Sequence, residues 1–387
     1  MSAPLRVGLN LIFMGERAGG AGRYARELPG ALLAAEPQTE VHVFVSRDAP
    51  ADLREQPWAG SVRWVTVPIS LQGPPLQLPA EYALLPALAA ARRLEVLHSP
   101  ANLGPTLTPT ITSVVSLLDL IWLHRPEEWE ASPRVHRTMR RRVARAVAGA
   151  DRIFAISRAA ADDFTATLGL GADRIEVTPL GVAAPTAPPL AEQTLRTRLG
   201  LGQARVVLCV AQKRPYKNLH RLLRALPELD EQVVLVLPGS PTAHERELRS
   251  LAAELNVEGR VHFPDWLSES ELEGLYALSE VFVLPSLIEG FGLPVIEAMQ
   301  RGLPVACSNA PALAEVAGDG ALLFDPERQA EVTAAIGRLL DDRELARSLA
   351  VSGRERAREF SWRRTGELSL HGYRRAIADR LGTAVSR

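Results

Sequence analysis

The sequence predicts an α/β protein made of two doubly wound parallel-sheet domains in tandem. Short apolar runs alternate with longer helical patterns along all 387 residues, as in βαβ units. Most of these runs are apolar without alternation, which indicates strands buried on both faces of a parallel sheet. The chain is also longer than one ordinary domain of roughly 100–200 residues. Each domain is expected to open a binding crevice at the carboxyl ends of its strands, and the two crevices to face a central cleft.

Thirteen apolar runs account for the expected strands. Those of the first domain cover residues 6–12, 40–46, 62–68, 96–100, 113–120, 152–157 and 175–181, and those of the second cover 205–211, 233–239, 260–266, 281–286, 303–309 and 320–326. Between the two series, residues 184–193 carry three prolines among small residues, which is typical of a linker. We therefore expect domains at 1–183 and 194–367, and a C-terminal helix over about 368–387 that packs back on the first domain.

Charge and composition exclude several function classes. The formal net charge of -1 gives no electrostatic case for a nucleic-acid partner. We find neither a secretion signal nor a run of about 18 apolar residues, so we expect a cytoplasmic protein. The two cysteines, Cys209 and Cys307, lie in apolar strand-like runs, where buried reduced thiols are expected.

A basic helix is expected around residues 135–152. It places Val135, Met139, Val143 and Val147 at helical spacing, with arginines on the opposite face. The usual arrangement buries such a stripe inside the protein and leaves the charges in solvent. The alternative is a weak peripheral contact between the arginine face and anionic lipid at the inner face of a membrane.

The stretch PSLIEGFGLPVIEAM, residues 285–299, combines a glycine corner with two glutamates. Gly290 and Gly292 permit a tight turn, and the free N–H groups at the start of the next helix can bind an anion such as a phosphate. Glu289 lies at the carboxyl end of a strand, where a carboxylate can accept hydrogen bonds from ligand hydroxyls. Glu297 is expected near the third helical position, where the helix dipole alone favours a carboxylate, so a structural role is equally open.

The only lysines of the chain, Lys213 and Lys217, lie with Arg214 in the segment QKRPYKN, after the first strand of the second domain. Elsewhere the chain uses arginine for its positive charges. A lysine is a compact point charge, which suits a phosphate that gains charge during a reaction. The segment is therefore expected to neutralise a diphosphate, and the alternative is a solvated basic loop.

The first domain offers further candidates at its strand ends. The glycine-rich loop around Gly20 either approaches a phosphate or only makes a turn, and Arg23 in the same loop can meet a diphosphate. Asp119 and His98 are expected at strand ends that face the same cleft. For His98, a hydrogen-bonded structural role is the favoured interpretation, and a ligand contact is the alternative. The sequence has no zinc-type ligand spacing. No metal is expected, because the basic loop can neutralise the charge that a cation neutralises elsewhere.

These residues resemble the retaining glycosyltransferases of family 4, the group 1 glycosyltransferases with the GT-B architecture of two Rossmann-like domains. The resemblance rests on the block from Pro285 to Pro326, on the RPYKN loop and on the preceding segment VHFPDWLSESELEGLYALSEVFV. It continues through shorter first-domain pieces such as GGAGRY, LHSPANLGP and IEVTPLGV, so that it covers nearly the whole chain.

The resemblance implies a donor site for a nucleotide diphosphate sugar. It implies that Glu289 holds hydroxyls of the donor sugar and that Lys217, with Arg214, stabilises the diphosphate leaving group. Glu297 is then implied to bind the ribose hydroxyls, and Gly20 to approach the phosphates. Further donor contacts are implied for the corner formed by Gly290, Phe291, Gly292 and Leu293.

The sequence departs from the family pattern at three places. The arginine that many members carry five or six positions before the lysine has no counterpart, which leaves the choice of Arg214 open. Leu118 stands where many members have a histidine, so that contact on the acceptor or sugar side is either missing or supplied by His98 or His124. Asp265 stands where many members have a glycine near the expected base-binding loop, so nucleobase preference does not carry over.

The resemblance therefore implies a cytoplasmic retaining glycosyltransferase that works without a metal or other cofactor. The resemblance implies the transfer of a hexose-type sugar from a nucleotide-sugar donor to a hydroxyl-bearing acceptor, in bacterial glycan or secondary-metabolite glycosylation. The alternatives are a nucleotide-sugar epimerase or phosphorylase on the same fold, and a catalytically silent nucleotide-sugar-binding protein. Slow hydrolysis of one nucleotide sugar without an acceptor distinguishes the transferase from the silent protein.

Overall fold

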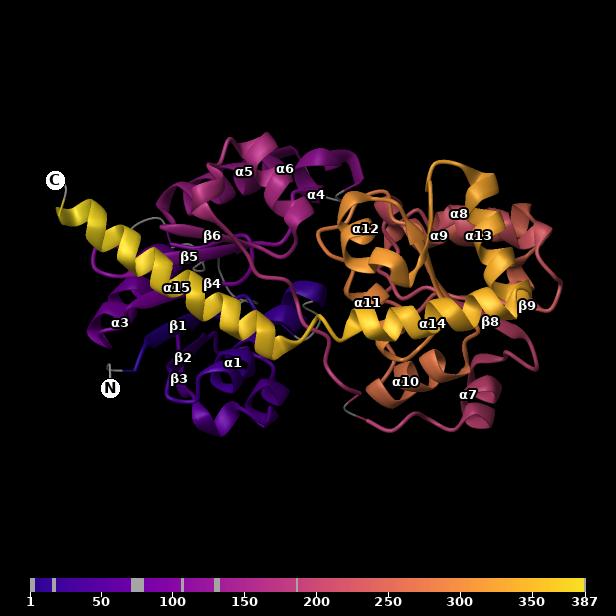
Figure 1. The fold of residues 1–387 in the computed structure, drawn as a ribbon, viewed down its shortest axis with the longest axis horizontal. Coiled ribbons are helices and arrows are strands. Elements are labelled where there is room, and N and C mark those ends of the chain that lie inside the picture. Colours follow the sequence, from indigo (N-terminus) through magenta and orange to yellow (C-terminus); the bar gives the residue numbers. More distant parts are fainter. Residues whose placement is uncertain are drawn as a thin grey trace. The chain divides into compact units, whose positions relative to one another are not determined.

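The computed structural model describes residues 4–15, 19–70, 80–105, 108–128, 133–185 and 187–385. It forms two compact units, each with its own sheet (Figure 1). The first unit is built from residues up to Pro126, from the segment that ends at Gly181 and from the chain after Ser361, and the second consists mainly of Val182–Phe360. The expected linker 184–193 includes Thr186, which lies outside the described residues.

The first unit contains a parallel sheet of seven strands in the order β3-β2-β1-β4-β5-β6-β7. Its strands are apolar and mostly buried, because helices cover the sheet as expected for parallel strands. The strands are β1 (Arg6–Asn10), β2 (Glu40–Val45), β3 (Arg63–Thr66), β4 (Val96–Ser99), β5 (Thr112–Leu117), β6 (Arg152–Ala155) and β7 (Ile175–Val177). The helices are α1 (Gly19–Ala35), α3 (Leu85–Ala91), α4 (Ile121–His124), α5 (Pro133–Gly149), α6 (Arg158–Leu168) and α15 (Trp362–Val385).

The last helix of the chain, α15, belongs to the first unit and lies along α1 (Figure 1). A Cβ atom added to Gly366 would meet the carbonyl oxygen of Ala31 at 2.0 Å, so glycine is needed where the two helices touch. Further along, Arg374 forms an ion pair with Glu36 at 2.5 Å. The helix begins at Trp362, earlier than the expected start near residue 368.

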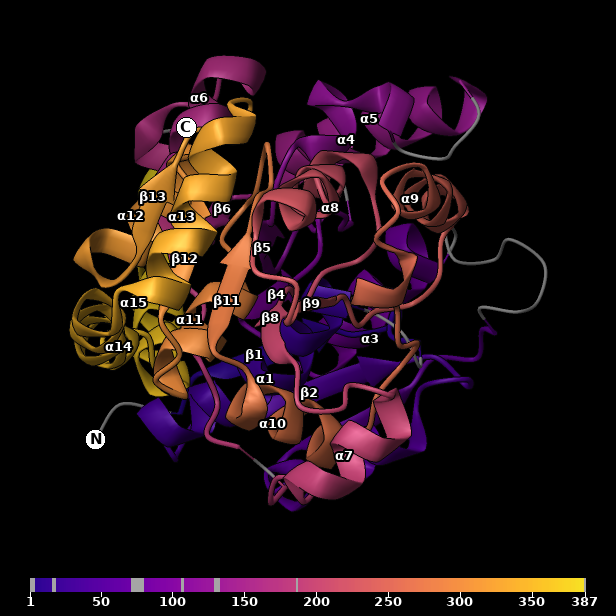
Figure 2. The same ribbon diagram turned by 90° about the vertical axis from the view of Figure 1, so that its right-hand side faces the viewer.

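The second unit contains a parallel sheet of six strands in the order β10-β9-β8-β11-β12-β13. Figure 2 shows β13, β12, β11, β8 and β9 following one another across this sheet. The strands are β8 (Arg205–Leu208), β9 (Val233–Val236), β10 (Val261–His262), β11 (Val281–Leu284), β12 (Val305–Ser308) and β13 (Leu322–Phe324). The helices are α7 (Glu192–Leu199), α8 (His220–Ala225), α9 (Ala243–Glu254), α10 (Glu269–Leu278), α11 (Leu293–Gln300), α12 (Pro311–Ala317), α13 (Gln329–Asp341) and α14 (Arg343–Ala357).

Local sequence signals set the starts of several helices. Before α6, the Ser157 hydroxyl accepts a hydrogen bond from the N–H of Ala160, and before α14 Asp342 caps the N–H of Leu345. Helix α10 begins with a reciprocal capping box between Ser268 and Glu271. These caps satisfy backbone donors that the helix itself leaves unpaired.

Both sheets confirm the predicted doubly wound α/β class, and all thirteen expected strands are present. In each sheet the chain adds strands in one direction from a central strand and then returns to that strand's other side. The reversal lies between β1 and β4 in the first unit and between β8 and β11 in the second. In open parallel sheets, ligands bind beside such a reversal, at the carboxyl ends of the strands.

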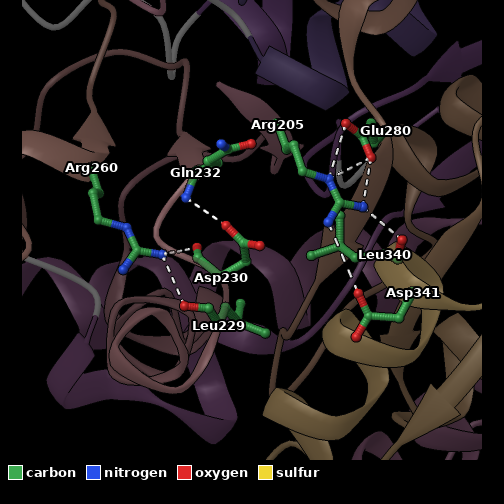
Figure 3. A network of polar contacts seen from close by, with 8 residues as sticks. All are labelled: Arg205, Leu229, Asp230, Gln232, Arg260, Glu280, Leu340 and Asp341. Carbon is green, nitrogen blue, oxygen red and sulfur yellow. Dashed lines mark hydrogen bonds and ion pairs between the residues drawn. The ribbon is translucent and has the colours of Figure 1, made fainter. Parts of the chain in front are cut away.

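Arginines organise the opposite, amino-terminal edge of the second sheet (Figure 3). The guanidinium of Arg205, at the start of β8, donates to Glu280 at 2.9 Å and to the carbonyl of Leu340 at 2.6 Å. Arg260 donates to the carbonyl of Asp230 at 2.7 Å. A planar guanidinium can bridge several acceptors at once, which explains the use of arginine here and leaves the lysines to the other edge.

Candidate functional site

The candidate site of the second unit lies at the reversal between β8 and β11. These strands pair in parallel, so the loops that follow them leave the sheet at the same edge. The loop after β8 carries Lys217, in a single turn at Pro215–Lys217, and the loop after β11 carries Glu289. Residues 72 positions apart in sequence are thereby brought to one place.

Lys217 and Glu289 form an ion pair. The Lys217 Nζ atom donates to Glu289 Oε1 at 2.5 Å, and the Ser286 hydroxyl donates to the same oxygen at 2.7 Å. The side chains of Lys217 and Glu289 are only 15% and 9% exposed. Burial by itself lowers the pKa of Lys217, but the charge of Glu289 outweighs it, so the pKa lies above the usual value for lysine. The pairing therefore favours the charged ammonium form of Lys217.

The glycine corner between β11 and α11 forms the tight turn that the sequence predicts. Gly292, which precedes the first residue of α11, has φ +103°, a conformation that favours glycine. A Cβ atom at this position would lie 2.4 Å from Cδ2 of Leu313, so space also requires glycine. Pro294 follows in the first turn, where its missing N–H costs no hydrogen bond.

Glu297 is not in the first turn of its helix. Helix α11 begins at Leu293, and its first turn contains no acidic residue. The expectation that the helix dipole alone explains Glu297 is therefore wrong, since that effect falls off within the first turn. The carboxylate is instead buried, with 6% of the residue exposed, and accepts a hydrogen bond from the Tyr276 hydroxyl at 3.2 Å. Its role toward ribose stays a prediction.

Lys213 differs from Lys217 in its surroundings. Its side chain is 0% exposed, donates to the carbonyl of Gly239 and forms an ion pair with Glu245 at 3.3 Å. Its own carbonyl accepts a hydrogen bond from the Thr242 hydroxyl at 2.5 Å. We therefore correct the expectation that Lys213 binds a phosphate: in this structure its ammonium is enclosed by acceptors that tie the loop after β8 to the loop after β9.

The remaining donor-side candidates of the second unit lie around the ion pair. Arg214 is half-buried and directly precedes the turn with Lys217. In the corner, Gly290 is buried, Phe291 packs edge-on against Phe360, and Leu293 opens α11 with 9% exposure. These positions are close to Lys217 and Glu289 in the two loops, and their contacts with a donor stay predictions.

Sequence reasoning missed Asn218, which joins the two loops. Its amide nitrogen donates to the carbonyl of Pro285 at 3.0 Å and to that of Pro326 at 2.9 Å. Its φ of +59° is one that asparagine tolerates better than most residues. The one available signal was its position directly after Lys217. Ser286 and Tyr276, which hold Glu289 and Glu297, were missed as well.

The first-domain candidates are placed by local structure. Gly20 and Arg23 lie in the first turns of α1, which follows the carboxyl end of β1. The Asp119 carboxylate accepts a hydrogen bond from the N–H of Ile121 at 3.1 Å, at the start of α4. His124 ends that helix and its Nε2 atom lies 2.8 Å from Asp163.

His98 is a core residue, and its expected contact with a ligand is corrected. It is 0% exposed, with Nδ1 2.7 Å from the Tyr373 hydroxyl and Nε2 2.8 Å from the Ser116 hydroxyl. Tyr24 in turn lies 3.0 Å from Ser116. The structural role left open by the sequence is thus the one observed, and it links β4 and β5 to α1 and α15.

This buried histidine makes stability depend on pH. Burial lowers the pKa of His98 from 6.5 to about 3, so in acid the unfolded chain takes up a proton that the folded chain resists. The stability is present above pH 6.5 and is lost progressively toward pH 3. At pH 5 we expect a loss of about 2 kcal/mol in the free energy of unfolding, measured by urea titration.

The matched variants for this test are His98→Gln and His371→Gln. His98→Gln should remove the part of the decrease in the free energy of unfolding between pH 6.5 and pH 5 that comes from His98, whatever its effect on stability at neutral pH. His371→Gln replaces an exposed histidine and should keep that decrease. An unchanged decrease in His98→Gln would contradict the assignment.

The basic helix α5 buries only part of its apolar stripe. Val143 and Val147 are buried, Met139 is half-buried, and Val135 is 52% exposed. A contact between this helix and lipid stays a prediction. In the part of the chain that the structure describes, no helix is long and apolar enough to cross a membrane. Cys209 and Cys307 are buried free thiols, as expected, and burial raises the pKa of each to about 12.

Two family models match the chain in succession. A model described as Glycosyltransferase Family 4 matches residues 18–184, and one described as Glycosyl transferases group 1 matches residues 192–356. Together they cover most of both units.

Known proteins resemble the chain in sequence and in structure. A protein named MMP alpha-(1->4)-mannosyltransferase, from Mycolicibacterium hassiacum, is 36% identical over 266 residues, which are 65% of this chain and 61% of that protein. The match thus spans less than two thirds of that relative. A sucrose-phosphate synthase structure from Thermosynechococcus elongatus superimposes with a TM-score of 0.76 at 23% identity, covering 97% of this chain and all of that one. Anabaena HepE in complex with UDP and glucose gives 0.70 at 20% identity, covering 98% of this chain and all of that one.

Proposed function

Because this chain belongs to the group 1 glycosyltransferases, we propose that it transfers a hexose-type sugar from a nucleotide diphosphate sugar to an acceptor hydroxyl, with retention of the anomeric configuration. The observation that carries the proposal is the ion pair between Lys217 and Glu289, at the strand reversal of a sheet whose solved relatives have the GT-B fold. A mannosyltransferase among the relatives supports a hexose as the transferred group.

The proposed roles follow from charge. When the bond between the anomeric carbon and the diphosphate oxygen breaks, negative charge grows on the leaving group, and the Lys217 ammonium stabilises it. The Glu289 carboxylate accepts hydrogen bonds from sugar hydroxyls. The backbone N–H groups of the Gly292 corner, at the start of α11, favour negative charge. Glu297 is proposed to accept from the ribose hydroxyls.

In the proposed scheme, retention arises because the acceptor oxygen attacks on the face that the diphosphate leaves. The new bond joins the anomeric carbon to the acceptor oxygen, and the acceptor proton passes to the departing diphosphate. The products are then the glycoside and a nucleoside diphosphate. In this scheme no protein side chain forms a covalent bond with the sugar, and the work of the protein is to hold the donor and stabilise the leaving group.

We expect transfer without a divalent cation, because Lys217 supplies the positive charge that a metal supplies in other phosphate sites. The measurement begins with a thermal-shift screen of nucleotide sugars, since at equal concentration a donor that binds more tightly raises the stability more. The best donor is then incubated without acceptor, and the sugar released by slow hydrolysis is followed by NMR. Its first-formed anomer should match the donor, and excess EDTA should leave the rate unchanged.

Different results separate the alternatives. Release of the opposite anomer would contradict retention, and loss of turnover in EDTA that is restored by Mg²⁺ would contradict the metal-free scheme. Isomerisation of the nucleotide sugar without its cleavage would indicate an epimerase. Tight binding with no turnover would indicate the silent binding protein.

A further inference from the structure

Two side chains at the end of strand β10 have no role in the site described so far. Asp265 and Trp266 follow this strand closely, and both are exposed. Trp266 is 61% exposed, which is unusual for the largest apolar side chain. Within the described ranges, the Asp265 carboxylate has no hydrogen-bond or ion-pair partner. Asp265 directly follows Pro264, whose carbonyl accepts a hydrogen bond from the loop after β9.

The loops after β8, β9 and β10 are fixed to one another by backbone contacts. The N–H of Gly239, after β9, donates to the carbonyl of Pro264 at 3.2 Å. Gly239 has φ +145°, and a Cβ atom there would lie 2.6 Å from the carbonyl oxygen of Ala211, after β8. Beneath them, the buried Lys213 ammonium donates to the Gly239 carbonyl. Asp265 and Trp266 therefore follow a segment that is tied through Gly239 to the loop that carries Lys217.

Strand geometry gives the separation of the strand ends from which the two loops leave the sheet. β10 is separated from β8 by β9 alone, and neighbouring strands lie about 4.8 Å apart, so the two strand ends are about 10 Å apart. That separation is within the span of a nucleoside diphosphate from its phosphates to its base. Glu289, proposed for the sugar, follows β11 on the other side of β8. A donor would thus extend along the edge of the sheet, with its base toward β10.

We propose that Asp265 and Trp266 bind the base of the donor nucleotide and select guanine, an inference that rests on the donor site proposed above. An ionised carboxylate only accepts hydrogen bonds, through two oxygens. Guanine presents two adjacent donors, the N1–H and the 2-amino group, which match these oxygens. Uracil presents one N–H between two carbonyl oxygens that repel a carboxylate, and the same edge of adenine or cytosine has one donor beside an acceptor nitrogen. The exposed indole offers a face on which the base stacks.

The test is calorimetric binding of GDP, IDP and UDP to the full chain. IDP differs from GDP only in lacking the 2-amino group of the base, so it keeps the N1–H donor and one of the two proposed hydrogen bonds. We expect GDP to bind at least about tenfold more tightly than UDP, with IDP between them, because each hydrogen bond to a charged group is worth about a factor of ten. Lys217→Ala should weaken all three to a similar extent, since it acts on the shared diphosphate.

Variants of the exposed pair sharpen the test. Asp265→Asn should lower GDP affinity by about tenfold or more, abolish the difference between GDP and IDP, and not weaken the binding of UDP. Trp266→Ala should weaken all three nucleotides by about tenfold, and Trp266→Phe should restore most of that loss, because stacking does not depend on the base. Glu254→Gln removes an exposed carboxylate at the end of α9 and serves as the control that leaves every affinity unchanged.

The outcomes separate this inference from the proposed function. UDP binding more tightly than GDP, or an unchanged preference in Asp265→Asn, overturns the guanine assignment and leaves the transferase proposal intact. A full chain that binds none of the three nucleotides overturns both. A preference for GDP that is present in the unmodified chain and in Glu254→Gln, but absent in Asp265→Asn, supports the assignment even before an acceptor is identified.

Discussion

Replacing Lys217 with alanine is expected to lower the rate of donor cleavage by about a thousandfold, which corresponds to about 4 kcal/mol of lost transition-state stabilisation. The Lys217 ammonium is the positive charge held beside Glu289 at the strand reversal, and the loss falls on the step in which the diphosphate gains charge. The measurement is the initial rate of nucleoside diphosphate release at saturating donor. Arg224→Ala, which removes an exposed charge from the following helix α8, should keep the wild-type rate.

A loss of activity must be separated from a loss of folding. Lys217→Ala leaves the Glu289 carboxylate at 9% exposure without its ion pair, so some loss of stability accompanies the loss of rate. The double variant Lys217→Met/Glu289→Gln removes both charges and should recover most of that stability without recovering activity. A rate within tenfold of wild type in either variant would sink the catalytic assignment.

Replacing Lys213 with methionine is expected to lower the stability of the protein and to leave its affinity for nucleotides almost unchanged. The free energy of unfolding should fall by about 3 kcal/mol, since the change leaves Glu245 without a buried partner and the Gly239 carbonyl without its donor. Glu245 keeps its other ion pair, with Arg249 at 2.7 Å, which limits the loss. At a temperature where the variant is folded, diphosphate affinity should change by less than about threefold, because this ammonium is enclosed.

The measurement is urea unfolding followed by a probe in the second unit, together with GDP and UDP binding. Lys213→Met/Glu245→Gln is the matched double variant, and it should recover part of the lost stability because it also removes the carboxylate left by the single change. If Lys213→Met had the unfolding midpoint of the unmodified chain but lost much of its affinity for both nucleotides, Lys213 would bind phosphate after all.

The contrast between the two lysines shows where sequence reasoning ended. They are four residues apart in one loop, and both were expected to face a diphosphate. Lys213 is enclosed because Gly239 and Glu245, which come later in the chain, fold over it. Lys217 instead meets Glu289, from the loop after β11. No local pattern distinguishes these environments, because each depends on partners 26 to 72 positions away.

The structure changed the interpretation of two other candidate site residues for similar reasons. His98 was placed correctly at a strand end, but only the packing of α15 brings Tyr373 to its Nδ1 atom and closes it off. Glu297 was placed correctly in the helix after the glycine corner, but the true helix start moved it out of the first turn and Tyr276 holds it instead. Helix starts depend on the exact backbone path through Gly292, which the sequence constrains only to the nearest few residues.

The sequence by itself determined the features that depend on local chemistry. Apolar runs without alternation predicted the buried parallel strands, and the Gly-Phe-Gly-Leu-Pro corner predicted the tight turn before α11, because side-chain burial and backbone φ are properties of short segments. The tertiary structure alone decided which charges meet. It ordered the strands so that β8 lies beside β11, paired Lys217 with Glu289 and enclosed Lys213 and His98. The physical reason is that pairing and desolvation depend on distance in space, which is set by contacts between segments far apart in the chain.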